Sequence, residues 1–212
     1  MNFYYLDSTW MLEHINEIFP TSPDKQKLWD SAMRAFLWAR SFRDELFEKL
    51  LPHIEALCRE TLDEREQTAL GDRIGFYYIR KATHHSCHEN LIKKICNIGK
   101  EKPAIFSSTI NFMVRSYNEE DNGKEIRKYI RYRYKMIKDN PKNYKNELNA
   151  IIYTYKCFPK MGKRDYLIIR KAFEISDLNT RSFEIIDVYK YFLEKERYSY
   201  LIQLMKLELK NN

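Results

Sequence analysis

The sequence predicts an all-α protein, because of both its composition and its periodicity. The 212 residues include only 5 Gly and 6 Pro, too few for the tight turns of an all-β sandwich or barrel. Apolar residues recur instead at spacings of three and four, the period of a helix with one apolar face. Only Phe76–Ile79 and Asn2–Leu6 resemble short strands. We therefore expect antiparallel helix pairs packed as an α-solenoid or an irregular helical bundle.

The first helix is expected to start at a cap formed by Asp7 or Ser8 and to stop before Pro20. A second helix should start at Ser22, because a cap residue followed by Pro23 is typical of helix beginnings.

A broad apolar stripe over residues 42–58 predicts the next helix, in which Pro52 produces a kink or a break. Residues 63–82 are ambiguous, because Gly71 and Gly75 weaken a helix that the apolar spacing otherwise supports.

The second half of the chain has clearer helix signals. Ser86 and Glu89 form a capping-box pattern that opens one helix, and Pro103 begins another. Short polar links then separate amphipathic segments at about residues 124–139, 142–157, 163–175, 181–195 and 197–210. A pair of these helices spans about 37 residues, within the range of helical repeats, although no repeated signature accompanies the periodicity.

Charge and aromatic residues divide the chain into two subregions. Residues 1–83 hold 11 Lys/Arg and 14 Asp/Glu, a net charge of −3, and all three Trp. Residues 84–212 hold the other 26 Lys/Arg and 16 Asp/Glu, a net charge of +10, and most of the Tyr. We expect a slightly acidic N-terminal helical subregion and a basic, Tyr-rich C-terminal helical array.

Several functional classes are not supported by any motif. The few glycines form neither of the spacings that cradle nucleotide phosphates, so no nucleotide cofactor is expected. No run of about 18 apolar residues and no signal-peptide pattern occur, so we expect no membrane span and a cytoplasmic location. The four Cys are scattered, which favours buried free thiols over disulfides.

His84–His88 is the densest group of metal-ligand residue types, with Cys87 among three histidines. One short segment cannot direct all of these side chains at one zinc ion, and a site would need distant help from Cys58 or His53. A polar turn that caps a helix is the favoured interpretation, so we expect no metal. A Cys87 nucleophile activated by histidine is the weaker alternative.

The most informative stretch is Lys124–Lys145, which has nine Lys/Arg against two acids. On a helix, five of its basic residues fall within about 40° on either side of one line. This basic stripe consists of Lys124, Lys128, Arg131, Lys135 and Lys138. Tyr132 flanks it, together with Tyr129 and Tyr134, and could stack on bases. The stripe predicts contact with nucleic acid or with an acidic partner, unless neighbouring acidic helices neutralise it.

The first third of the chain resembles a known class of protein. The segments that carry the resemblance are Asp7-Ser-Thr-Trp10, Ile18-Phe19-Pro20, Leu28-Trp29, Ala35-Phe36-Leu37 and Glu45-Leu-Phe-Glu-Lys-Leu-Leu-Pro52-His53. About residues 7–60 resemble the helical C-terminal regions of large bacterial anti-phage defence proteins of the sirtuin-like or STAND ATPase type. The resemblance implies a helical array for assembly or recognition of phage components, and it identifies no functional residue. This chain has no effector domain, so the resemblance implies either a stand-alone relative or a part whose catalytic partner lies elsewhere.

We therefore expect a non-enzymatic helical module that binds a protein partner or its own copies, as a part of a bacterial defence system. Exposed aromatic residues such as Tyr132, Tyr191 or Tyr200 would be natural anchors, although each could equally pack between helices. The alternative is a nucleic-acid-binding protein that uses the basic face of residues 124–145. A third hypothesis, an enzyme that depends on Cys87 or a metal, lacks a supporting motif.

Overall fold

A computed structural model describes residues 8–39, 44–84, 93–95, 97–98, 102–118, 122–158, 161–175 and 183–211. All regular secondary structure in these residues is helical, which confirms the all-α prediction. The α-helices are α2 (Ser8–Glu13), α3 (Ile15–Ile18), α4 (Gln26–Leu37), α5 (Asp44–Leu57), α6 (Glu64–His84), α8 (Pro103–Arg115), α9 (Gly123–Ile137), α10 (Lys145–Ile152), α11 (Lys163–Ile175), α12 (Phe183–Glu194) and α13 (Tyr198–Asn211). Short 3-10 helices are η1 (Pro23–Lys25), η2 (Pro141–Tyr144) and η3 (Tyr153–Cys157).

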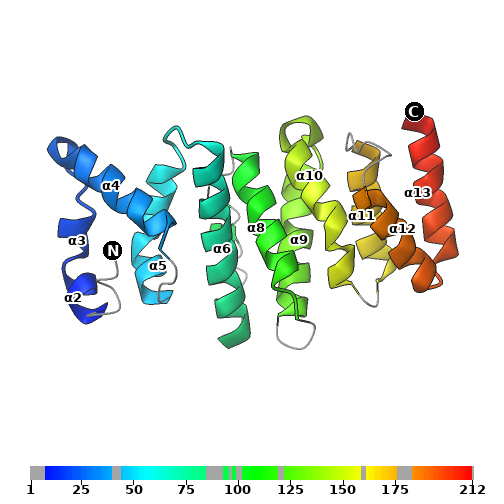
Figure 1. The fold of residues 1–212 in the computed structure, drawn as a ribbon, viewed down its shortest axis with the longest axis horizontal. Helices are drawn as coiled ribbons and strands as arrows, with labels where there is room; N and C mark the ends of the chain where they lie inside the picture. The colour runs from blue at the N-terminus through cyan, green and yellow to red at the C-terminus, as the bar shows by residue number, and fades with distance from the viewer. Residues whose placement is uncertain are drawn as a thin grey trace.

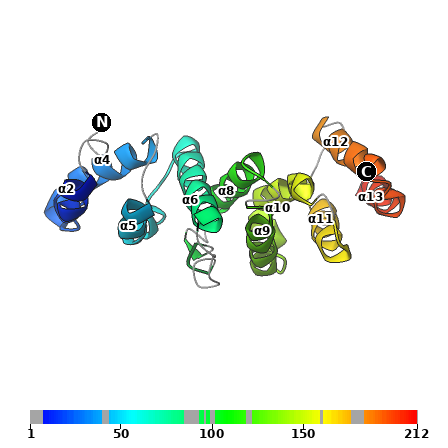
Figure 2. The ribbon, with the colours of Figure 1, turned by 90° about the horizontal axis from the view of Figure 1, so that it is seen from below.

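The helices follow one another in chain order along one elongated row, with α2 and α3 at one end and α13 at the other (Figure 1). Viewed from below, α8 and α10 lie in one layer and α9 and α11 in a second (Figure 2). One apolar core continues along the row, from Ile15 in α3 to Leu204 in α13. Helix length varies from 4 residues in α3 to 21 in α6. The finer alternatives, a regular α-solenoid or an irregular bundle, stay predictions.

The helix boundaries predicted after residue 123 agree closely with the structure, with one correction. The expected helix over residues 142–157 is divided into η2, α10 and η3, so its α-helical part is only eight residues long. Pro141 starts the first 3-10 turn. In η3, the Thr154 hydroxyl donates to the carbonyl oxygen of Ile151 at 2.6 Å. This local hydrogen bond, to the residue three positions back, accompanies the tighter winding of a 3-10 helix.

The first three predicted helices also occur, with changed details. The helix before Pro20 is divided into α2 and α3 at His14, whose ring stacks on Trp10. Ser22 occupies the expected cap position, but its side chain makes no capping hydrogen bond and the helix begins with the η1 turn. Pro52 lies inside α5, which continues through it to Leu57 instead of breaking.

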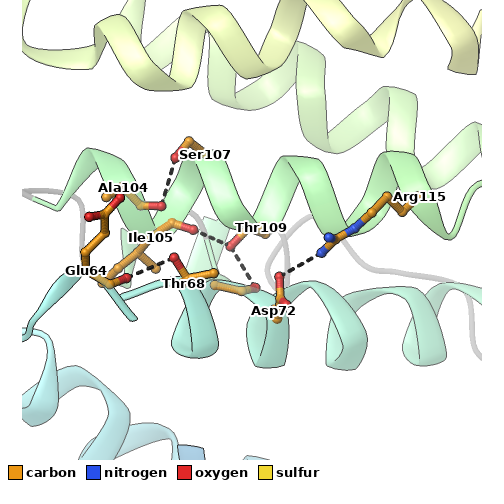
Figure 3. Close-up of polar contacts among 9 residues, drawn as sticks. Glu64, Thr68, Asp72, Ala104, Ile105, Ser107, Thr109 and Arg115 are labelled. Atoms are coloured by element: carbon orange, nitrogen blue, oxygen red, sulfur yellow. Dashed lines mark hydrogen bonds and ion pairs between the residues drawn. The ribbon is translucent and has the colours of Figure 1, made fainter. Parts of the chain in front are cut away.

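The ambiguous residues 63–82 form the long helix α6, and the two glycines explain how it packs. A Cβ atom at Gly71 would lie 2.4 Å from the carbonyl oxygen of Ile105 and 2.6 Å from the Cβ of Ser108, both in α8. At Gly75 the nearest atoms would lie at 3.0 Å. The Thr109 hydroxyl bonds the Ile105 and Gly71 carbonyl oxygens at 2.8 and 3.1 Å (Figure 3). Glycine therefore lets the two helix backbones come close together, at the cost of lower helix propensity.

Acidic residues near the start of α6 are structural. The backbone N–H of Glu66 donates to Asp63 at 2.8 Å, and the backbone N–H of Asp63 donates to Glu66 at 3.0 Å. This is a capping box. The Glu66 side chain is buried and pairs with Arg34, so this carboxylate is not part of a solvated helix face. Six residues further along the helix, Asp72 pairs with Arg115 of α8 at 3.3 Å (Figure 3).

Some predictions fall partly or wholly outside the described residues. The candidate strand Asn2–Leu6, the Ser86–Glu89 capping box and Cys87 are among them. The other candidate strand, Phe76–Ile79, is helical and belongs to α6. The α6–α8 contact joins residues on either side of the expected division near residue 83. Within the described part of the chain, no helix has both the length and the apolar character that a membrane crossing requires.

Candidate interaction surfaces

The basic stripe lies on α9, and most of its charges have acidic neighbours. Lys128 pairs with Glu125 at 3.6 Å, one turn back along the same helix, and Lys138 pairs with Asp139 at 2.9 Å. Arg131 makes the strongest contact of the stripe. Its Nε and Nη2 atoms lie 2.6 and 2.5 Å from one carboxylate oxygen of Asp165, a buried residue at the start of α11.

Lys124 and Lys135 are exposed, and neither pairs with a carboxylate among the described residues. Two of the five positions of the stripe are thus exposed with no carboxylate partner among the residues that the structure describes, and the central Arg131 pairs with a neighbouring helix. Acidic residues on α9 and α11 therefore neutralise much of its charge. Contact with nucleic acid or an acidic partner through this stripe stays a prediction.

Tyrosines beside the stripe contribute to packing. Tyr129 is fully buried, so it is not available to stack on a base, and Tyr132 is half-buried against the core. Tyr134 is also partly buried, and burial raises the pKa of its phenol. The other proposed anchors lie between helices as well. Tyr191 donates to the carbonyl oxygen of Phe158 at 2.5 Å, and the ring of Tyr200 stacks on another tyrosine at 3.8 Å.

A buried ion pair between α9 and α10 was not expected from the sequence. Arg133 donates through Nε to Glu147 at 2.7 Å and through Nη2 to the second carboxylate oxygen at 3.2 Å. Both side chains are at most 1% exposed. The guanidinium carbon of Arg133 lies 3.5 Å from the ring centroid of Phe106, a cation–π contact. Burial raises the pKa of Glu147 to about 7, while Arg133 acts to lower it.

The distant residues proposed to complete a metal site are buried elsewhere. Trp29 donates its indole N–H to Nδ1 of His53 at 2.9 Å, and burial lowers the pKa of this imidazole. Burial raises the pKa of the Cys58 thiol to about 12, which opposes thiolate chemistry. His84 ends α6, and the rest of His84–His88 lies outside the described residues. Across the residues that are described, no three His, Cys, Asp or Glu side chains converge as metal ligands would.

The last helix, α13, carries an apolar row on its outer side. We call this row the outer stripe; it consists of Tyr198, Ile202, Met205 and Leu209. These side chains are 54, 51, 46 and 78% exposed, respectively. Their spacings of 4, 3 and 4 place them within about 60° on a helix. A second apolar face of α13, which includes the fully buried Leu204, packs against α11 and α12.

A basic cavity of about 290 Å³ opens where α6, α8 and α10 begin. We call it the lysine pocket, and the residues that define it are Lys102, Lys142, Lys145, Gln67, Asn143 and Asn146. Those three helices start at the same edge of the row (Figure 1). The described residues that line the pocket include no carboxylate.

A larger depression, of about 460 Å³, lies between α4 and α6 beside the exposed Trp38. Its lining combines Asp72, whose pKa is raised by burial, with Arg73, whose pKa is lowered by burial. Opposite charges lie side by side here, so this depression does not indicate one class of ligand.

Comparisons with models of known protein families, with curated proteins and with solved structures find no match. The described residues form an elongated all-α protein with a packed middle, a last helix that has an exposed apolar row, and a basic pocket.

Proposed function

We propose that this protein is a non-enzymatic helical interaction module that associates with a second copy of itself through the outer stripe of α13. The observation that carries the proposal is that α13 has two apolar faces, of which the described residues pack against only one. A helix at the surface of a monomer usually has one apolar face and a polar opposite side. A contiguous row of exposed apolar side chains is typical of an interaction site.

The spacing of the outer stripe suits a helical partner. Residues repeating at 4, 3 and 4 form the a and d positions of a short coiled-coil seam. In an antiparallel pair related by a two-fold axis, Ile202 of one copy packs against Met205 of the other, and Tyr198 packs against Leu209. The same patch then serves both copies, as a two-fold interface requires.

Charges beside the stripe are compatible with this pairing. In the antiparallel register, Lys206 of one copy faces Ser199 of the other, and Glu208 faces Leu201. No like charges are therefore opposed across the seam, and the two helix dipoles run in opposite directions. Glu208 also accepts a hydrogen bond from Tyr189 of α12 within its own chain, which fixes its position at the edge of the stripe.

The wider setting rests on the resemblance of residues 7–60 to helical regions of bacterial defence proteins. In those proteins the helical array serves assembly or recognition, and self-association is a form of assembly. We include a role in a bacterial defence system in the proposal on that ground.

Association through three turns of helix buries a small area, so the interface should be weak. We expect a dissociation constant on the order of 10 µM, at the low end for specific protein interfaces. Sedimentation velocity of the full chain, at concentrations from about 1 to 200 µM, should show a monomer–dimer equilibrium across this range.

Ile202→Glu should abolish the dimer, because the substitution buries a charge in the seam of each copy. Leu28→Glu is the matched control, since Leu28 is also an aliphatic residue, is 50% exposed and lies on α4 near the opposite end of the row. A chain that stays monomeric throughout the range would overturn the proposal. So would a dimer that persists in Ile202→Glu, or one that Leu28→Glu disrupts equally.

A further inference from the structure

We propose that the lysine pocket binds a phosphoryl group, supplied either by a free phosphate compound or by the backbone of a nucleic acid. The pocket lies in the middle of the row, and α13 takes no part in it. The inference is therefore independent of self-association through the outer stripe.

Side chains of the lysine pocket supply hydrogen-bond donors and positive charge. Lys102, Lys142 and Lys145 provide ammonium groups, and Asn143, Asn146 and Gln67 provide amide groups. The Lys102 ammonium group donates to the backbone carbonyl oxygen of Glu60 at 3.2 Å, which positions the side chain without cancelling its charge. Lysine is a common phosphate ligand, acting as a point charge with several donors.

The fold adds to this positive field. The pocket is lined by Gln67 in the first turn of α6, by residues at the start of α8, and by η2 and the first residues of α10. The N-terminal ends of helices carry partial positive charge and unpaired N–H groups. The start of α6 is capped by Asp63 and Glu66. The starts of α8 and α10, at the same edge (Figure 1), reinforce the attraction of the lysines for an anion.

The basic stripe differs from the pocket in the acidic residues that line it. On α9, Lys128 and Arg131 are matched by Glu125 and Asp165. The described lining of the lysine pocket contains no carboxylate, and the pocket is concave. A concave site lined by charge of one sign concentrates its field, which an exposed helix face does not.

Two probes test the proposal on the full chain. Binding of inorganic pyrophosphate is measured by calorimetry, and binding of a fluorescein-labelled single-stranded DNA by fluorescence anisotropy at about 50 and 200 mM salt. The test variant is Lys142→Gln/Lys145→Gln, in which both substitutions lie in the pocket. The matched control is Lys124→Gln/Lys135→Gln, which removes the same charge from the exposed positions of the basic stripe. Circular dichroism checks folding, and Lys142→Gln alone replaces the double variant if the latter does not fold.

We expect the pocket variant to weaken binding at least about tenfold, and the control to weaken it by less than about threefold. Pocket-dependent binding of pyrophosphate that matches or exceeds that of DNA identifies a free phosphate compound as the ligand. Tighter, steeply salt-dependent and pocket-dependent binding of DNA identifies a nucleic-acid backbone. Equal losses in the two variants overturn the proposal, as does the absence of binding of both probes at the lower salt concentration.

Discussion

The middle and the C-terminal end of the row differ in which side chains they bury: the middle buries charged side chains, and the end exposes apolar ones. Around α8, α9 and α10, a charged pair is enclosed: Arg133 and Glu147 are at most 1% exposed and bond each other twice. On α13, by contrast, the outer stripe leaves four large apolar side chains 46 to 78% exposed. The middle encloses this charged pair between neighbouring helices of the chain, whereas the end leaves apolar side chains exposed.

This difference indicates where substitutions should affect folding and where they should affect association. In the middle, a buried side chain packs against neighbouring helices, so its loss should reduce the free energy of unfolding. On the outer side of α13, a side chain has few partners in the same chain, so its loss should leave folding almost unchanged.

The largest effect is expected for Arg133→Ala. This substitution leaves Glu147 buried without its counter-charge, and removing one member of a buried pair costs about 3–5 kcal/mol of stability. The free energy of unfolding in urea measures the loss. Lys171→Ala provides the comparison, because Lys171 pairs with Glu174 at 3.0 Å at an exposed position, where a pair contributes about 0–1 kcal/mol. Similar losses of stability in the two variants would show that the buried Arg133–Glu147 pair contributes no more than the exposed Lys171–Glu174 pair.

Gly71→Ala should cost about 1–3 kcal/mol in the same measurement, because the added Cβ overpacks the α6–α8 contact. The direction of the change in unfolding free energy distinguishes packing from helix propensity. Helix propensity alone predicts that alanine stabilises the interior of a helix by about 1 kcal/mol. The Cβ at Gly71 would approach backbone at 2.4 Å, whereas Gly75→Ala would meet its nearest atom at 3.0 Å and should cost less. Stabilisation by Gly71→Ala would contradict the close approach of the two helices.

Periodicity was sufficient to predict most of this fold. The segment 163–175 matches α11, and the neighbouring helices are displaced by only a few residues at each end. Sequence periodicity reports which face of a helix is apolar, and that face determines whether the helix packs. It does not report how closely two helices approach, which is why Gly71 indicated weakness in the sequence and a tight contact in the structure.

The surfaces were harder to predict, because they depend on pairs of residues that are distant in the chain. Asp165 lies 34 residues beyond Arg131, and nothing local indicates that they meet. Arg133 did carry a signal: at 100° per residue it falls on the apolar side of α9, opposite the basic stripe. An arginine on an apolar face indicates a buried partner. The outer stripe also had a signal in the sequence, since α13 has apolar residues on two sides.

His53 provides a smaller, pH-dependent test of the packed region. Burial lowers its pKa, and its Nδ1 accepts the hydrogen bond from Trp29, so protonation is disfavoured in the folded chain. The unfolded chain binds more protons than the folded chain below about pH 6.5, and stability therefore falls as the pH is lowered from that value. The loss approaches about 1.4 kcal/mol per pH unit, the limit for one proton.

His53→Phe should remove this component, so the difference in unfolding free energy between the two proteins should depend on pH below about 6.5 and be constant above it. Urea unfolding at several pH values measures the difference. A difference that is independent of pH would show that His53 is protonated equally in the folded and unfolded chains.

The smallest effect on folding is expected for Ile202→Ala, and its value lies in the contrast with Leu204→Ala two residues later. Leu204 is fully buried, so its truncation should cost about 2–5 kcal/mol, whereas truncation at the 51%-exposed Ile202 should change stability by less than about 0.5 kcal/mol. Both values refer to dilute protein, where the chain is monomeric. Because association stabilises the folded state by mass action, the wild-type chain should gain stability as its concentration rises, and Ile202→Ala should gain less. A cost at Ile202 that is large even in dilute solution would mean that the outer stripe contributes to the fold of the monomer. The contrast between packing in the middle of the row and association at α13 would then fail.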